Sequence, residues 1–363
     1  MSKRDSKFEL MRIFAMVLIV VCHIFAHCIN EQLVNPTQYD SAALFTNFSV
    51  YRRLVITDLA CSLGTIGNNL FILLSGYFMI NRQINISKQI VKIASEMIFI
   101  VFILMFISYI HIHHELIRST VSIRSFNDGW WFAGYYLSII IMAYIFNNIL
   151  SPKIDRKKHA TLLLILFSII SFSYIRSAIN KTIPDVIVTG VFIFMLGGYI
   201  RLYNPLKKIK SVLLVLTIVI VVLMMSGSYY LYSQGNINNA IFNKQISYNL
   251  VINGYSVYSI PCVIIGVALF ELFSRITIKN SNIINFIGSS TFIVYLLHDN
   301  SYSWQWFFKV NWIELIYYKN YGMLILYIGL YVLVIFTLGI ILYSIFSVIF
   351  KAASNYYYKI RNI

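Results

Sequence analysis

The stretch RIFAMVLIVVCHIFAH, residues 12–27, is an apolar segment with an arginine at one end and two histidines at the other. Its length and apolar character predict the core of a membrane-spanning helix, which we expect over residues 8–29. Lipid disfavours ionisable side chains, and those found within a membrane span usually face a polar cavity or a reaction site. Arg12, His23 and His27 are therefore the first candidates for a functional site.

The composition extends the membrane interpretation to the whole chain. Hydrophobic residues make up 59% and charged residues 12% of the 363 residues, whereas a soluble domain has roughly 25% charged residues. Apolar runs of about 20 residues, each long enough to cross a bilayer, recur along the chain. We expect an all-α, polytopic integral membrane bundle, a single domain over residues 1–363 with about ten transmembrane helices. The expected spans are residues 8–29, 54–80, 93–110, 130–150, 160–175, 185–203, 211–232, 248–273, 282–299 and 321–350.

The net charge of +16 is distributed as a membrane topology requires. With the N-terminus in the cytoplasm, about two thirds of the basic residues lie in cytoplasmic segments, in agreement with the positive-inside rule. Both termini are then cytoplasmic, and the longer polar loops face outward. The charge orients the helices, and no nucleic-acid partner is needed to explain it. A secretory signal is not favoured, because the first apolar run lacks a short core and a small-residue cleavage site. The four cysteines have no metal-like spacing and are expected to be buried thiols.

Arg12 and His23 lie on one face of the expected first helix. They are eleven residues apart, which brings a helix back to within about 20° and separates them by about 16 Å along its axis. Glu9 lies three residues before Arg12 and can pair with it near the cytoplasmic boundary. Two other interpretations stay open: Arg12 can snorkel from the helix end, and His23 can be a satisfied core histidine. We expect His27 to be interfacial.

A second apolar segment, GSSTFIVYLLHDN (residues 288–300), also ends in a histidine, His298. His23 and His298 each lie about fifteen residues into their spans, which places both imidazoles roughly 22 Å from the cytoplasmic face. Two histidines at one depth, with Asp299 beside one of them, suit general acid–base chemistry. Asp299 can alternatively just close the helix. Because two histidines without cysteine partners are a weak zinc signal, we expect no metal.

These residues resemble the acyltransferase 3 family, whose members are membrane enzymes that O-acylate carbohydrates. The resemblance starts from the spacing of Arg12 and His23 and continues, in order, over nearly the full chain. The further segments are GNNLFILLSGYFM (67–79), WWFAGYYL (130–137), FMLGGYI (194–200) and STFIVYLLHDN (290–300). There are two departures. Asn69 stands where many relatives carry Asp, and NRQINISKQIVK (81–92) replaces an arginine-rich stretch.

The resemblance implies transfer of an acyl group from cytoplasmic acyl-CoA, most often acetyl-CoA, to a hydroxyl of a polysaccharide or a lipid-linked glycan. In that reaction Arg12 would bind the donor, and His23 would act as general base or take the acyl group transiently. His298 would stabilise or orient the acceptor. A multi-pass protein of this kind is expected in the bacterial cytoplasmic membrane, in contact with membrane lipid. The outer aromatic residues can stack on sugars or form a membrane-interface belt; they are Trp130, Trp131, Tyr135, Tyr136, Trp304 and Trp306.

Two other functions fit the sequence less well than acyl transfer. A polysaccharide exporter or flippase would use Arg12, His23 and His298 to line a conduit, but such proteins typically have more spans and internal repeats. A glycan polymerase would need a large outer catalytic loop, and the longest loop expected here has only about 24 residues. Membrane acyl transfer is therefore the favoured function.

Overall fold

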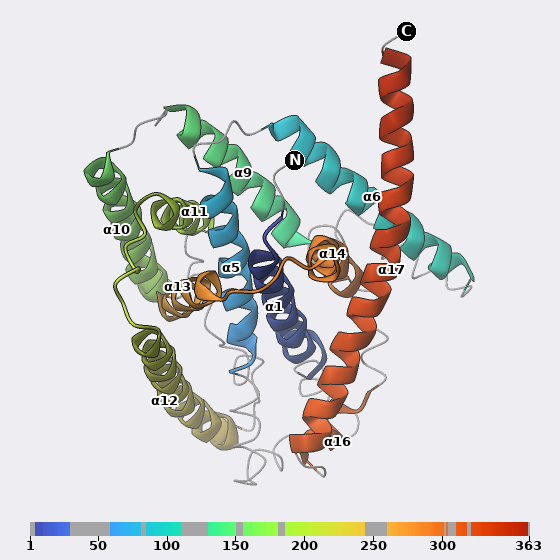
Figure 1. Ribbon diagram of the computed structural model, residues 1–363. Helices are drawn as coiled ribbons and strands as arrows, with labels where there is room; N and C mark the ends of the chain where they lie inside the picture. Colours follow the sequence, from blue (N-terminus) through green and yellow to red (C-terminus); the bar gives the residue numbers. More distant parts are fainter. Residues whose placement is uncertain are drawn as a thin grey trace.

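The computed structural model describes residues 4–29, 59–80, 85–110, 130–149, 155–180, 186–243, 260–300, 303, 310–317 and 321–361, and these contain helices and no strand. The helices are α1 (Ser6–His23), the π-helix η1 (Ile24–Ile29), α5 (Cys61–Met79), α6 (Ile86–Ile110), α9 (Trp131–Ile149), α10 (Arg156–Asn180), α11 (Val186–Tyr203), α12 (Ser211–Asn243), α13 (Ile260–Arg275), α14 (Asn282–His298), α16 (Trp312–Tyr317) and α17 (Tyr321–Arg361) (Figure 1). The expected all-α class is confirmed, and every expected span overlaps one of these helices.

Several described helices have the length and apolar character of membrane spans. Four are long and apolar enough to cross a bilayer, namely Ser6–Cys28, Ile86–Ile107, Ser211–Ser228 and Tyr321–Ala353. Three shorter apolar helices cover Trp131–Ile145, Ile187–Tyr203 and Asn282–His298. The protein is thus a helical membrane protein, while the number of about ten spans and the cytoplasmic position of both termini stay predictions.

Helix α1 lies at the centre of the bundle, with α5 on one side and α14 on the other (Figure 1). Half of its apolar segment is buried, against 11% for the corresponding segment of α12 at the periphery. Met11, Ala15 and Val20 are fully buried. The exposed side chains of α12 are themselves apolar, with Leu223 and Met224 more than 60% exposed. Such a surface suits lipid rather than water, which explains why the ionisable residues of α1 have to be sheltered by its neighbours.

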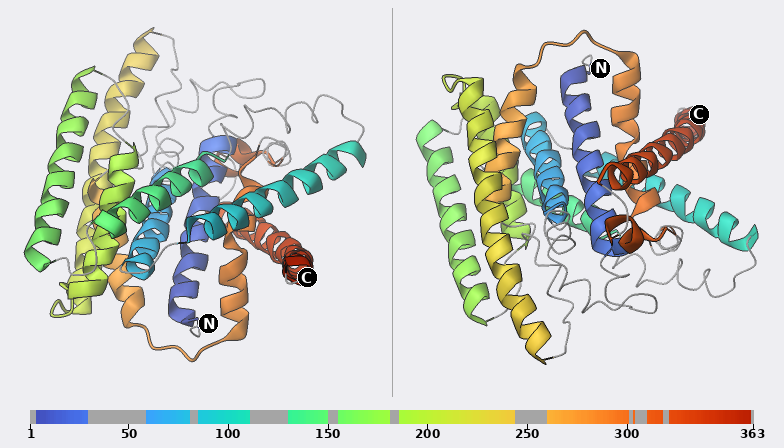
Figure 2. Two further views of the ribbon diagram at one scale, coloured as in Figure 1. Left: turned by 90° about the horizontal axis from the view of Figure 1, so that it is seen from above. Right: turned by 90° about the horizontal axis from the view of Figure 1, so that it is seen from below.

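Helices α1 and α14 begin side by side and run in the same direction. The link 276–281 carries the chain from α13 to α14 past the N-terminal end of α1 (Figure 2). There Ser6 Oγ lies 2.8 Å from Oδ1 of both Asn280 and Asn285, and it accepts a hydrogen bond from the amide of Ser281 at 2.8 Å. Because both helices rise by about 1.5 Å per residue from this common start, residues equally far along them reach the same depth.

Close glycine contacts hold α5 against α11. A Cβ atom added at Gly76 would overlap the carbonyl group of Phe194, and one added at Gly197 would overlap the carbonyl group of Leu73. Small residues allow helix backbones in a membrane to approach this closely. The two sequence segments that contain these glycines are therefore packing partners.

Several described helices begin or end at residues other than those expected, and two of these differences lie in segments expected outside the spans. Helix α6 begins at Ile86, so much of the stretch 81–92 belongs to a helix and projects Gln89 and Lys92 from its first turns. The helix α16, Trp312–Tyr317, lies within the expected outer loop 300–320. Asn311 caps it, because its Oδ1 accepts a hydrogen bond from the amide of Glu314 at 3.0 Å.

Candidate functional site

The structure brings together the two histidines that the sequence placed at one depth. His23 ends α1 and His298 ends α14, and His23 Nδ1 lies 3.0 Å from His298 Nε2. The His298 ring is buried, with 1% of its surface exposed. The common start of the two helices accounts for this meeting, because each histidine lies at the far end of its helix.

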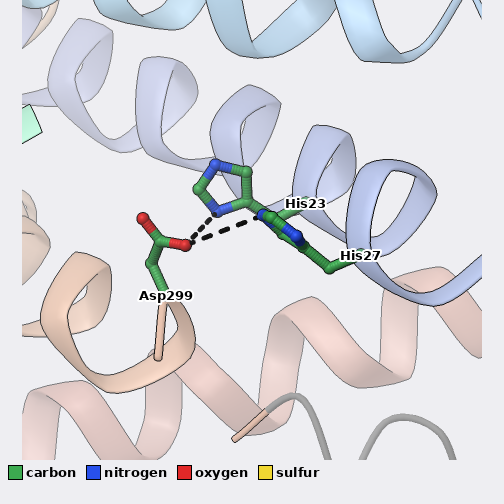
Figure 3. A group of neighbouring side chains, drawn as sticks. All are labelled: His23, His27 and Asp299. Atoms are coloured by element: carbon green, nitrogen blue, oxygen red, sulfur yellow. Dashed lines mark ion pairs between the residues drawn. The ribbon is translucent and has the colours of Figure 1, made fainter. Parts of the chain in front are cut away.

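Asp299 adds a carboxylate to the pair. Its Oδ1 lies 3.4 Å from His23 Nδ1 and 3.9 Å from His27 Nε2, and only 2% of its side chain is exposed. Figure 3 shows Asp299 at the end of α14, pointing at the two histidines of α1 and η1. His27 is one third exposed, and its ring centre lies 5.2 Å from that of His23. His27 is thus half-buried beside the pair.

A set of hydrogen bonds fixes the end of α14. The last carbonyl groups of a helix lack partners within it. Here the amide group of Asn300 donates to the carbonyls of Leu296 and Leu297 at 3.0 and 2.8 Å. The indole nitrogen of Trp130 also donates to Leu296 O, at 3.1 Å. Trp130 is 5% exposed, so it supports α14 from within the core and belongs to neither an interface belt nor a sugar-binding surface.

A cavity of about 310 Å³ lies among α1, α5, α6, α9 and α14, on the side of the pair from which α1 and α14 begin. Three basic side chains line it: Arg4, Arg12 and Lys92. The remaining lining is largely apolar and includes Met16 and Ile19 on the face of α1 that carries Arg12 and His23. The cavity therefore follows the stripe of α1 that the sequence singled out.

Arg12 is held within this cavity by Glu9. Its NH1 group lies 3.0 and 3.1 Å from the two carboxylate oxygens of Glu9, and one third of its side chain stays exposed. Glu9 is buried against α14, where a Cβ atom added at Gly288 would crowd its carboxylate. The expected pairing of Arg12 with Glu9 is thus present. The guanidinium also faces the cavity, with nitrogen atoms that are not bonded to Glu9.

Further polar side chains, from α5, α6 and α9, line this cavity. Glu96 on α6 is buried, and its Oε1 has no hydrogen-bond partner among the described residues, although Lys92 Nζ lies 4.0 Å away. Ser75 Oγ and Tyr136 OH share a hydrogen bond of 2.9 Å in the same cavity. A buried acceptor without a partner is costly unless a ligand or water satisfies it.

The cavity ends one helical turn below the histidine pair. Ile19 and Tyr295 line it, whereas His23 and His298 do not. Tyr295 nevertheless connects the two regions, because its hydroxyl accepts from the amide of Phe132 at 3.3 Å and hydrogen-bonds to Asp299. Its ring centre lies 6.1 Å from that of His298. The expected route from Arg12 to His23 is therefore present as far as Tyr295.

A second cavity, of about 360 Å³, lies among α10, α11, α12 and α13. Its lining is apolar apart from the hydroxyl groups of Thr189 and Thr217. Its lining contains no titratable side chain that could activate these hydroxyl groups, so it does not compete with the α1–α14 region as a reaction site.

His23, His27 and Asp299 also form a group whose ligand atoms lie within 4.8 Å of one another. Histidine nitrogens and carboxylate oxygens can bind zinc. A metal on His23 Nδ1 would have to displace the contact of that nitrogen with His298 Nε2. With His23 Nδ1 as the ligand atom, the group could hold an ion only after this rearrangement, and the absence of a metal stays a prediction.

Sequence reasoning identified His23, His298 and Arg12 but gave no role to Tyr295 or Glu96. The i, i+4 spacing of Tyr295 and Asp299 is the one signal that could have found the first. Asn69 is buried, and neither of its amide atoms has a partner among the described residues. Trp304 and Trp306 lie outside the residues that the structure describes.

A comparison with protein families supports the chemistry that the site suggests. A family model described as an acyltransferase domain, that of the acyltransferase 3 family, matches residues 5–350. No curated protein and no solved structure was found to match the chain. The matched region includes both histidines of the pair and two of the three basic residues that line the cavity, Arg12 and Lys92. The chain therefore belongs to the acyltransferase 3 family of membrane acyltransferases.

Proposed function

We propose that the protein transfers an acyl group, in the first instance acetyl, from cytoplasmic acyl-CoA to a hydroxyl of an extracytoplasmic or lipid-linked cell-surface polysaccharide. His23 is the general base, and the membrane is the bacterial cytoplasmic membrane. One observation carries the proposal. A cavity with basic side chains at one end leads, through Tyr295, toward a paired and largely buried histidine.

The order of side chains along the cavity suits an acyl-CoA donor. Arg4, Arg12 and Lys92 offer positive charge to the phosphate groups of the nucleotide. One helical turn beyond Lys92, the free oxygen of Glu96 can accept a hydrogen bond from an amide of the pantetheine arm. The thioester then lies toward Tyr295, at the end of the cavity nearest the histidines. The phosphate groups of the donor thus lie near basic side chains, an amide of its pantetheine arm lies near the hydrogen-bond acceptor Glu96, and its thioester lies toward the histidines.

The transfer needs one proton acceptor. His23 takes the proton of the acceptor hydroxyl while the hydroxyl oxygen attacks the thioester carbonyl carbon. The C–S bond breaks, the CoA thiolate takes the proton from His23, and the products are the ester and free CoA thiol. His23 ends neutral, ready for another turnover.

The test uses inverted membrane vesicles from producing cells, supplied with acetyl-CoA labelled in its acetyl group. We expect base-labile label in surface glycan together with an equal amount of free CoA thiol. His23→Gln should lower both rates by about 10²–10⁴-fold, the usual cost of losing a general base. His159→Gln is the matched control, because His159 is a fully buried histidine on α10 that contacts α11 rather than the site.

Protein abundance is measured for each variant in the same vesicles. A His23→Gln variant that is present at normal abundance and transfers label at the normal rate contradicts the proposal. Glycan that crosses the membrane without release of CoA thiol contradicts it too, and supports an exporter.

A further inference from the structure

We propose that His298 and Asp299 are positioning residues that hold His23 with a proton on Nδ1, so that Nε2 is its basic atom. The effect of this arrangement on catalysis rests on the proposed function. The position of the proton on His23 can be measured without any turnover. It gives His298 a different role from that of orienting the acceptor.

The hydrogen bond of His298 to Val294 fixes the position of its own proton. His298 Nδ1 lies 2.7 Å from the carbonyl oxygen of Val294. A carbonyl oxygen can only accept, so Nδ1 must carry the hydrogen. In a neutral imidazole the other nitrogen is then an acceptor. His298 therefore presents a lone pair at Nε2 to its neighbour.

His23 supplies the hydrogen that this lone pair needs. His23 Nδ1 has two close neighbours. His298 Nε2 lies 3.0 Å from it, and the carboxylate oxygen Oδ1 of Asp299 lies 3.4 Å from it. Both neighbours are acceptors, so both favour a proton on Nδ1 of His23. The lone pair of the neutral His23 ring is then on Nε2. This nitrogen has no hydrogen-bond partner among the described residues.

Asp299 is placed to compensate the charge that His23 acquires. Its carboxylate is held by Tyr295, its backbone amide donates to the carbonyl of Tyr295 at 3.0 Å, and its Oδ2 has no partner in the described part of the chain. When Nε2 takes the hydroxyl proton, the ring becomes a cation with Asp299 at 3.4 Å from its Nδ1. A carboxylate in this position orients an imidazole and stabilises its cation, as in the Ser-His-Asp triad.

Other titratable groups face this pair and will affect the same pH range. They are His27 on η1, Cys22 on α1, Tyr295 on α14 and Tyr331 on α17. Asp299 is the acid that the structure places in ion-pair contact with His23, at 3.4 Å. The pH dependence of the reaction should therefore respond most to Asp299.

The step leaves every proton accounted for. The hydroxyl proton moves to His23 Nε2, the new C–O bond forms, and the C–S bond breaks. The same proton then moves from Nε2 to the thiolate sulfur. The proton on Nδ1 stays in place, shared with His298 Nε2 and Asp299 Oδ1, and no other reactant is consumed.

The direct test is nitrogen NMR of the protein labelled with ¹⁵N in its seven histidines, in bilayers. The signals of His23 are assigned by their loss in His23→Gln. We expect a protonated Nδ1 and an unprotonated Nε2 at pH above the titration of the ring. The opposite tautomer overturns the inference. This measurement stands even if no acyl transfer is found, so the failure of the inference and the failure of the proposed function are distinguishable.

The kinetic test compares three variants. His298→Leu removes the acceptor, and we expect kcat to fall about 100-fold or more, with an unchanged KM for acetyl-CoA. His298→Gln keeps an acceptor oxygen near the position of Nε2, so it should recover most of the rate. Asp299→Asn should lower kcat and move the acid limb of the pH–rate profile to lower pH, because the cation of His23 loses its counter-charge.

Three results would contradict the positioning role of His298 and Asp299. The first is an unchanged pH profile in Asp299→Asn at wild-type abundance, and the second is equal loss of rate in His298→Leu and His298→Gln. The third is loss of activity on dialysis against a chelator with recovery on addition of zinc, which would assign His23 Nδ1, His27 and Asp299 to a metal instead.

Discussion

Arg12 pairs with Glu9 and also lines the cavity, and a lysine could do both only in part. Its guanidinium has several donors in one plane, so one group can bond to Glu9 while others face the cavity. A lysine carries the same charge at a single point. The side chain at this position therefore tests whether the cavity binds an anion through oriented hydrogen bonds or through charge alone.

We expect Arg12→Lys to raise the KM for acetyl-CoA about tenfold, the equivalent of one charge-assisted hydrogen bond, with little change in kcat. Steady-state release of CoA thiol measures both quantities. Arg201→Lys is the control, because the exposed Arg201 on α11 donates a hydrogen bond to the hydroxyl of Tyr77 on α5 and does not line the cavity. A normal KM in Arg12→Lys would show that Arg12 only snorkels from its helix.

At this scale the sequence predicted what depends on regular helix geometry. The shared face of Arg12 and His23, and the equal depth of His23 and His298, follow from the rise and rotation per residue. The contact of Trp130 with Leu296 depends instead on how the start of α9 packs against α14. No local pattern encodes that packing, so the aromatic residues at 130–137 gave the wrong expectation for Trp130.

At the scale of the element, the α5–α11 contact is the closest tie between two helices that the glycines reveal. Backbone faces backbone at Gly76 and Gly197, and no flexible side chain lies between that could move aside. The sequence shows that Gly76 and Gly197 leave room for a close neighbour. It does not show which helix is the partner, because a small residue allows any neighbouring helix to approach closely.

Gly76→Ala should therefore destabilise the protein by about 1–3 kcal/mol or more, since the added methyl group overlaps the carbonyl of Phe194. Gly227→Ala is the matched control, because a Cβ atom there meets nothing within 4 Å. That variant should be neutral or up to about 1 kcal/mol more stable, owing to the better helix propensity of alanine. Thermal unfolding in detergent, followed by circular dichroism, measures both. Equal melting temperatures would contradict the tight contact.

The boundaries of α6 show a second limit of the sequence at this scale. Polar residues at 81–92 favoured a loop, yet the helix begins at Ile86 and places Lys92 and Glu96 on the cavity. A polar first turn is ordinary for a helix that enters a membrane from water. The apolar periodicity marks only the part of such a helix that lies within the bilayer.

For the molecule as a whole, the order and type of the helices were predictable, and the cavity was not. Each apolar run announces a helix on its own, whereas the cavity needs side chains from five helices far apart in the sequence. The orientation in the membrane is a prediction of the same global kind. It rests on the larger number of Lys and Arg residues in the segments assigned to the cytoplasmic side of the membrane.

That orientation can be measured by labelling single cysteines in a chain from which Cys22, Cys28, Cys61 and Cys262 have been replaced. Lys157→Cys lies in the exposed first turn of α10 and should react with an impermeant maleimide only after the cells are opened. Ser122→Cys falls in the expected outer loop 111–129, outside the described residues, and should react in intact cells. Labelling of position 157 from outside would reverse the proposed direction of transfer.

The length of α14 has a consequence for the lipid around it. Its 17 residues extend about 25 Å, less than the roughly 30 Å of a hydrocarbon core. If its first residue lies at the cytoplasmic boundary, His298 and Asp299 end several ångströms below the opposite boundary. A short hydrophobic element is accommodated by local thinning of the bilayer. We therefore expect transfer to be fastest in thin bilayers and to slow in phosphatidylcholines of increasing chain length, because thicker lipid would cover the site against a hydroxyl arriving from outside. A rate independent of chain length in reconstituted vesicles would show that the surrounding lipid does not limit access.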